Sequence, residues 1–280
     1  MGRRWQEVII KTAEEAKQNK DYKATLTELL YQLADDDFIL AYRGSEWLGL
    51  APHIEEDVAF SSINQDTMGH ATIYYNLLED LGEGKSDDLA HMRPAAERQN
   101  AIILEEVNGT GDYLTEPRYD WAFAVVRNYF YDLAKKIKLE ALKTSSYEPL
   151  AHAAVKINME QYYHVMHWST WFKQLLSANE DAKKRMMTAV EKVWIDFDNV
   201  LSFGPKAKEL AELGIIEAEE TIKQRWISHM KAVFEELEID YPGELGSKRG
   251  NGRIGEHTTD LDEALKTLRE VYETDTVTAW

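Results

Sequence analysis

The sequence contains no cysteine. This excludes disulfide bonds, thiolate metal sites and cysteine nucleophiles, and the composition fits a protein of the reducing cytoplasm. The chain also lacks a run of roughly 18 apolar residues, so we expect no membrane-spanning helix. The segment Met1–Glu7 has no apolar stretch behind its two arginines, so we expect no secretion signal.

Proline and basic residues are scarce as well. There are only six prolines, and alternating β-branched runs are nearly absent, which predicts an almost entirely α-helical chain. The 32 Lys and Arg residues are outnumbered by 50 Asp and Glu residues, which gives a net charge of −18. Such a surface repels phosphate backbones and anionic lipids, so we expect neither nucleic acid nor a membrane as a partner, and it favours a more basic protein.

Apolar residues make up 44% of the chain, which is enough for a large core. They recur every three or four residues along several long segments, as in amphipathic helices. We expect four core helices at about 23–43, 55–81, 118–142 and 149–176. Shorter helices are expected at about 5–18, 95–106, 181–203, 206–213, 218–237 and 261–272.

Acidic residues interrupt the apolar stripes of the core helices. Asp37, Asp132 and Glu160 stand on three of these stripes where leucine is expected, and His70 stands on the fourth. A buried, unpaired carboxylate costs several kcal/mol, so such groups are paired, protonated or bound to metal. The pattern favours one shared polar centre inside a four-helix bundle. The alternative is that each residue lies at the edge of its stripe and reaches solvent.

Two segments match incomplete metal-binding motifs. A di-iron bundle takes one Glu from each of two helices and a Glu-x-x-His pair from each of the other two. Here His70 is present but Thr67 stands at the carboxylate position, and Glu160 is present but Tyr163 stands at the histidine position. His164 is a possible substitute ligand. We therefore expect no resident metal or other cofactor and no catalytic residue, and a carboxylate–His70–Tyr163 network with Lys135 or Lys136 could satisfy the centre itself.

The segment 242–256 is rich in glycine and is expected to be a mobile loop. It lacks the preceding strand and the Gly-Lys-Ser/Thr sequence of a phosphate-binding loop. Lys248, Arg249 and Arg253 nevertheless form a basic cluster in an acidic chain. We hypothesise that they dock against an acidic patch of a partner.

At these residues the chain resembles a known family, the non-catalytic C subunits of bacterial 1,2-phenylacetyl-CoA epoxidase. The matching segments keep their order and spacing from about Thr27 onward, and they are Gly44–Pro52, Glu55–Asp57, Asn64–Asp66, Asn128–Asp132, Glu160–His164 and Gly255–Thr258. The resemblance implies a ferritin-like four-helix bundle with additional peripheral helices. It also implies one domain over residues 1–280, with 1–22 as an extension and 257–280 as a C-terminal helix and tail.

The resemblance further implies a role beside a homologous catalytic A subunit that carries the complete di-iron set. Carried over onto this chain, the ligand positions of that homologue fall on Asp37, Thr67, His70, Asp132, Glu160 and Tyr163. His70 is a departure, since a histidine there is not expected of every C subunit. The expected assembly is a hetero-oligomer with the A subunit, and a homodimer is an alternative for the isolated chain.

Three hypotheses of function remain. The leading one is a structural subunit of an oxygenase complex without turnover of its own. The second is a free-standing di-metal oxidase with an unusual ligand set, and the third is a generic helical interaction module. Metal analysis separates the first two, and co-purification with the catalytic homologue tests the third.

Overall fold

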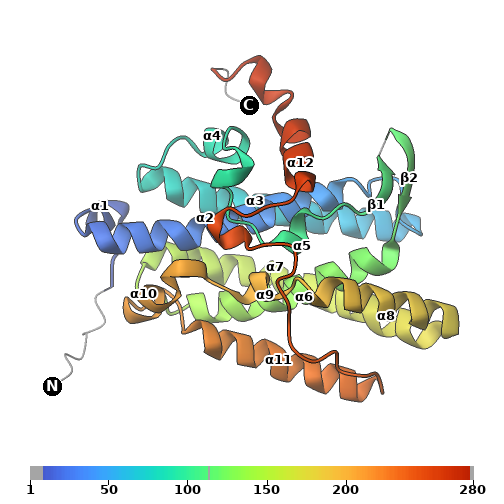
Figure 1. Ribbon diagram of the computed structural model, residues 1–280. Helices are drawn as coiled ribbons and strands as arrows, with labels where there is room; N and C mark the ends of the chain where they lie inside the picture. The colour runs from blue at the N-terminus through green and yellow to red at the C-terminus, as the bar shows by residue number, and fades with distance from the viewer. Residues whose placement is uncertain (1–8, 113, 278–280) are drawn as a thin grey trace.

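Four long helices form the centre of the computed structural model, which describes residues 9–112 and 114–277 (Figure 1). They are α2 (Lys20–Ser45), α3 (Ile54–Asp80), α6 (Trp121–Leu142) and α7 (Glu148–Ala178). Helix α2 packs along α3 and α6 packs along α7, so the bundle consists of two helical hairpins. The predicted all-α, ferritin-like bundle is confirmed, since the strands in the described part of the chain form only one short hairpin.

The sequence of α2 explains both where this helix begins and how it packs. The side chain of Asn19 caps the helix by accepting hydrogen bonds from two backbone N–H groups of the first turn. Leu26, Leu30 and Leu33, spaced by three or four residues, are buried in the cluster that α2 shares with α3. Each fully buried leucine stabilises the fold by about 1.5–3 kcal/mol.

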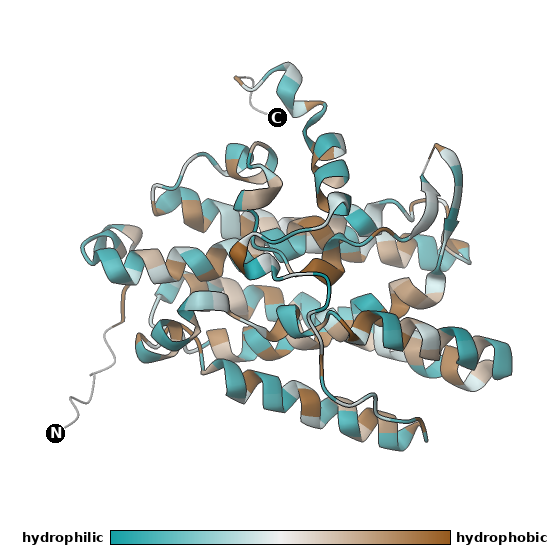
Figure 2. Ribbon diagram, in the orientation of Figure 1, coloured by the Kyte–Doolittle hydropathy of each residue, from teal (hydrophilic) through white to brown (hydrophobic). Residues whose placement is uncertain are grey.

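Helices α8 (Glu180–Trp194) and α11 (Glu219–Glu236) pack against α6. Figure 2 shows both banded with hydrophilic and hydrophobic residues along their lengths, as expected of amphipathic surface helices. Trp226 of α11 stacks on Phe197 and donates its indole N–H to the Phe130 carbonyl oxygen of α6, 3.1 Å away. These aromatic contacts hold the peripheral helices on the bundle.

The segment between α3 and α6 differs from the expected helix over residues 95–106. It contains α4 (Ser86–His91), a 3-10 turn (Ala95–Glu97), α5 (Ile102–Glu105) and an antiparallel hairpin of β1 (Gly109–Asp112) and β2 (Thr115–Tyr119). Glycine at position 109 permits the hairpin, because a Cβ there would lie 2.2 Å from the Arg118 carbonyl oxygen. The predicted helix is therefore limited to α5 and the 3-10 turn.

Residues 242–256, which we call the return segment, are packed on the bundle rather than free as expected. In Figure 1 this part of the chain runs back from the end of α11, past α9 (Asp198–Leu201) and α5, toward α12 (Thr259–Arg269). The backbone N–H groups of Gly246 and Lys248 donate to the carbonyl oxygens of Trp194 and Ile195. The carbonyl oxygens at the C-terminal end of α8 thus accept hydrogen bonds from the return segment, and the helix expected over 181–203 ends at Trp194.

The remaining predicted helices lie close to their expected positions. The chain forms α10 (Ala207–Glu212) and further 3-10 turns at Gly204–Lys206, Gly252–Ile254 and Tyr272–Thr274. Residues 1–8 and the terminal Trp280 lie outside the described residues. Over residues 9–18, the described part of the helix expected at 5–18, α1 covers Ala13–Lys17. No helix in the described part of the chain is both long and apolar enough to cross a membrane.

Candidate functional site at the bundle centre

Each helical hairpin places one aspartate and one histidine in the bundle centre. The first hairpin contributes Asp37 from α2 and His70 from α3, and the second contributes Asp132 from α6 and His164 from α7. All four side chains are buried, because their positions continue the apolar stripes of these helices. Asp37, Asp132 and His70 lie on three different helices, and all three are buried; their role as vestigial ligand positions stays a prediction.

On α7 the structure buries residue 161 rather than residue 160. Gln161 and His164 of α7 are buried, whereas the side chain of Glu160 is 43% exposed and Tyr163 is 63% exposed. Tyr163 therefore does not belong to the centre. The inward pair Gln161-x-x-His164 repeats the spacing of Thr67-x-x-His70 on α3.

Lys135 of α6 provides the positive charge at the centre. Its Nζ lies 2.8 Å from the Asp37 carboxylate and 2.9 Å from His70 Nδ1. An ammonium group has only hydrogens to donate, so Nδ1 accepts and the ring carries its hydrogen on Nε2. That Nε2 lies 2.6 Å from the Glu160 carboxylate, which completes a chain of polar contacts from Asp37 to the surface of α7.

Burial governs the protonation states of these groups. Burial, reinforced by the neighbouring ammonium of Lys135, lowers the pKa of His70 far below its ordinary value, so the imidazole is neutral at pH 7. Burial also raises the pKa of Asp37, although Lys135 and the Tyr131 hydroxyl, which donates to Asp37 at 2.7 Å, oppose this effect. Around Lys135, the centre thus holds the neutral His70 and the Lys135–Asp37 pair.

The second hairpin is less completely paired. Burial raises the pKa of Asp132, whose Oδ2 has no hydrogen-bond partner. Gln161 Nε2 donates to the backbone carbonyl of Asp132 at 3.1 Å. His164 Nε2 lies 3.1 Å from the Asp66 carboxylate of α3, while its Nδ1 is buried without a partner.

The donor set does not fit a di-iron centre. Two irons require several carboxylates to balance their charge, but Lys135 already neutralises Asp37, and Thr67 donates its hydroxyl to the Ile63 carbonyl within its own helix at 2.8 Å. Glutamine supplies no charge at position 161. Among the described residues, no group of three or more His, Asp or Glu side chains is arranged to hold a metal.

Two further buried aspartates precede Asp37 on α2, and the sequence analysis did not identify them. Asp35 accepts hydrogen bonds from Arg93, Arg98 and the Tyr75 hydroxyl. Successive residues of a helix point about 100° apart, so Asp35, Asp36 and Asp37 face three different parts of the molecule. The run Asp35–Asp37 inside a predicted core helix was the available signal.

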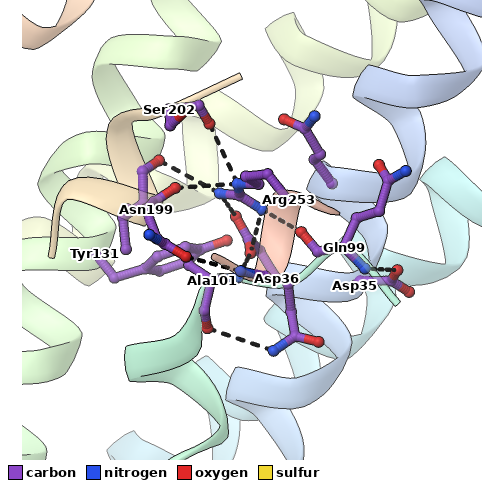
Figure 3. A network of polar contacts seen from close by, with 12 residues as sticks. Asp35, Asp36, Gln99, Ala101, Tyr131, Asn199, Ser202 and Arg253 are labelled. Carbon is purple, nitrogen blue, oxygen red and sulfur yellow. Dashed lines mark hydrogen bonds and ion pairs between the residues drawn. The ribbon is translucent and has the colours of Figure 1, made fainter. Parts of the chain in front are cut away.

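Asp36 pairs with Arg253 of the return segment, as Figure 3 shows. The two guanidinium NH groups of Arg253 lie 2.9 and 2.8 Å from the two carboxylate oxygens, and its Nε donates to the Asn199 carbonyl oxygen. Both side chains are buried. Arg253 is therefore an internal anchor and not the surface docking residue that the sequence suggested.

The other two residues of the predicted basic cluster have different surroundings. Arg249 pairs with Asp196 and Glu106, at 2.7 and 2.6 Å, and Lys248 is exposed. The three side chains therefore do not form one exposed basic surface.

A second anchor follows the return segment. His257 Nδ1 lies 2.7 Å from the buried Glu105 carboxylate, and its Nε2 lies 2.9 Å from the Arg98 carbonyl oxygen. Burial alone would lower the pKa of His257, but the hydrogen bond to Glu105 and the charge of Glu105 raise it overall. With an acceptor at each ring nitrogen, the imidazolium form is favoured.

Comparisons with known proteins agree with this architecture. A family model described as "Phenylacetic acid catabolic protein" matches residues 6–280. The C subunit of 1,2-phenylacetyl-CoA epoxidase from Escherichia coli (strain K12) is 27% identical over 245 residues, which cover 87% of this chain and 94% of that protein. The A subunit of the same enzyme is 24% identical over 184 residues, which cover 66% of this chain and 55% of that protein. The resemblance identified from the sequence is confirmed, and because the family model spans nearly the whole chain, the chain belongs to the phenylacetic acid catabolic protein family.

Proposed function

We propose that this chain is the structural, non-catalytic subunit of a 1,2-phenylacetyl-CoA epoxidase complex in aerobic phenylacetate catabolism. It binds a catalytic partner, the counterpart of the A subunit, and keeps it competent. The observation that carries the proposal is the position of Lys135, whose ammonium group lies between Asp37 and His70. A lysine there supplies the positive charge that a metal supplies in a di-iron bundle, so the bundle is stabilised without redox chemistry.

The ligand positions support a scaffold that has lost its metal site. Asp37, Thr67, His70 and Asp132 stand where the first three helices of a di-iron bundle place their ligands. On the fourth helix, Gln161 and His164 fit the pattern better than Glu160 and Tyr163, because only the former pair is buried. Thr67 and Gln161 are uncharged where a Glu-x-x-His pair has a glutamate, and Lys135 balances the charge of Asp37.

The rival functions have less support. A free-standing di-metal oxidase requires Lys135 to leave the centre, because its ammonium group occupies the Asp37 carboxylate and the His70 Nδ1 that would otherwise bind metal. A generic interaction module does not account for similarity to two subunits of one named enzyme. The cytoplasmic location, the single domain over residues 1–280 and a homodimer of the isolated chain stay predictions.

Metal content, activity and assembly together test the proposal. The purified chain is expected to hold far less than one iron or manganese per chain, to have no epoxidase activity alone, and to form a stable complex with the catalytic partner from the same genome. Stoichiometric metal that is lost in His70→Ala would support the oxidase instead. Failure of the two purified proteins to associate would reject the structural role.

A further inference from the structure

Three histidine–carboxylate pairs join α3 and α7. Glu56 of α3 contacts His167 at 2.9 Å, Asp66 contacts His164 at 3.1 Å, and His70 contacts Glu160 at 2.6 Å. As the residue number rises on α3 it falls on α7, so the two helices are antiparallel along this seam.

The antiparallel geometry fixes which residues face outward beside the seam. On both helices, the residue that precedes a seam residue is turned by about 100° to the same outer side. These positions and those one helical turn away along the same side form a surface that we call the α3/α7 face. Its exposed members include one acidic and one basic residue, Glu55 and Lys156. The others are uncharged, and they are Val58, Ser62, Gln65, Gly69 and Thr72 of α3 and Val155, Met159, Tyr163, Met166 and Thr170 of α7.

This composition is unusual for the surface of so acidic a chain. Val58 and Met159 are 64% and 69% exposed, yet the protein carries 50 Asp and Glu residues with which such positions could be filled. Methionine and tyrosine are typical of the cores of protein interfaces, where charged residues are depleted. An exposed apolar patch of this kind marks a contact surface.

Gly69 provides an independent indication. It lies in the middle of α3 with ordinary helical backbone, where glycine is a weaker helix former than any residue except proline. A Cβ built at this position meets no atom within 4 Å, so nothing in the described part of the chain requires glycine there. A partner helix that packs closely against α3 would explain the glycine at position 69, because small residues let two helix backbones approach one another.

The dimensions suit a second pair of helices. Between Ile54 and Asn76 the face is roughly 33 Å long and, across two helices, roughly 20 Å wide. The resulting area of roughly 650 Å² approaches the ~800 Å² per partner of a standard stable interface. At the Ile54 end, a cavity of about 520 Å³ between the two helices, lined in part by Glu56, Met166 and Trp171, can receive a partner side chain.

The charge of the chain decides between partners. Two copies would each bring a net charge of −18 and repel one another, whereas a less acidic helical partner would not. The chain is also similar to the A subunit of the same enzyme, which supplies a candidate other than a second copy. We propose that the α3/α7 face is the surface on which the catalytic partner docks through a pair of its own helices; this inference rests on the proposed function.

The test introduces one charge at Gly69. Gly69→Arg is expected to weaken binding to the purified catalytic partner roughly 100-fold in isothermal titration calorimetry, because a buried unpaired charge opposes association. The isolated full-length variant is expected to unfold at the same or a higher urea concentration, since arginine is a better helix former than glycine. Ser228→Arg, at an exposed position of α11, adds the same charge outside the face and is expected to change binding by less than about 3-fold.

The outcomes separate this inference from the proposed function. If the parent chain does not bind the catalytic partner, the proposed function fails, and the docking surface with it. If the parent binds but Gly69→Arg binds equally well, only the docking surface is rejected. Should Gly69→Arg fail to fold, Met159→Arg on α7 carries the same test. Self-association of the parent in analytical ultracentrifugation, abolished by Gly69→Arg, would assign the face to a homodimer and overturn the choice of partner.

Discussion

At the scale of single residues, the centre of this protein depends on Lys135. Its ammonium group donates to a carboxylate whose pKa burial has raised and to a histidine that burial keeps neutral. A buried ion pair adds little net stability compared with apolar packing, but loss of one partner leaves the other desolvated and unpaired. The neighbouring pair Asp36–Arg253 has the same property.

Replacing Lys135 by methionine tests this dependence. Lys135→Met is expected to lower the free energy of unfolding by about 3–5 kcal/mol, because Asp37 loses its counter-charge. The measurement is urea denaturation at pH 7 followed by circular dichroism. The double variant Lys135→Met/Asp37→Asn is expected to be more stable than the single one, since the amide carries no charge. A single variant as stable as the parent would show that Asp37 is neutral or solvated.

Two histidines are expected to give the stability opposite pH dependences. The folded-state pKa of His70 lies below its unfolded value of about 6.5, so the unfolded chain gains a proton first and stability is lost as the pH falls. The folded-state pKa of His257 is raised, so its contribution is complete below about pH 6.5 and is lost as the pH rises through the folded value.

Urea unfolding across pH 5–9 checks both signs. Each histidine can contribute a slope of at most about 1.4 kcal/mol per pH unit. His70→Gln is expected to flatten the acidic side of the stability curve, and His257→Gln its neutral-to-alkaline side. Curves that stay parallel to that of the parent would contradict these assignments.

At the scale of elements, the long helices were predictable and their connections were not. Stripes such as Leu26, Leu30 and Leu33 set the positions of the core helices, because packing one apolar face dominates helix formation in proteins. Gly109 and Thr110 pair with Tyr119 and Arg118 in the short β-hairpin, which the sequence analysis did not predict. The pattern within one segment does not show which residues of another segment pair with it, so the register of the hairpin could not be predicted.

The candidate site was predictable to within one residue on one helix. Positions 160 and 161 both lie within a wide apolar stripe, so periodicity alone could not decide which faces inward. The partners of Asp35 and Asp36 were beyond prediction, since Arg253 lies 217 residues from Asp36. The glycines at 246 and 252 suggested a mobile loop. In the structure they allow the backbone to pass close to neighbouring segments: at Gly252, a Cβ would lie 1.9 Å from the Asn100 carbonyl oxygen.

The anchoring of the return segment gives a prediction at this scale. Arg253→Met is expected to cost about 3–5 kcal/mol, because it leaves Asp36 buried and unpaired. It should also speed limited proteolysis within residues 242–256, which that guanidinium fixes to α2 and α9. Asp36→Leu/Arg253→Met is the matched control, expected to recover much of the stability. Equal proteolysis of parent and Arg253→Met would mean that backbone contacts alone hold the segment.

At the scale of the whole molecule, charge is the dominant property. A net charge of −18 on 280 residues produces self-repulsion that opposes the compact state. The buried ion pairs are shielded from solvent ions, so added salt acts chiefly on the exposed carboxylates. Most exposed residues of the α3/α7 face are uncharged, so a partner docked there meets little of this repulsion from the face itself.

Ionic strength should therefore stabilise the isolated chain. Raising NaCl from about 10 mM to about 150 mM shortens the Debye length from roughly 30 Å to roughly 8 Å and is expected to add on the order of 1 kcal/mol to the free energy of unfolding. Urea midpoints at the two salt concentrations measure the change, with choline chloride as a control for specific sodium binding. A decrease would show that exposed ion pairs outweigh the self-repulsion.

The Lys135 ammonium has a consequence for how a cell supplies such a complex. A metal cation must be acquired, delivered and kept reduced or oxidised, whereas a lysine arrives with the polypeptide during translation. Under the proposed function, the folding of this chain does not depend on the iron supply. In the proposed complex, the nutritional demand for iron then falls on one of the two related chains instead of both.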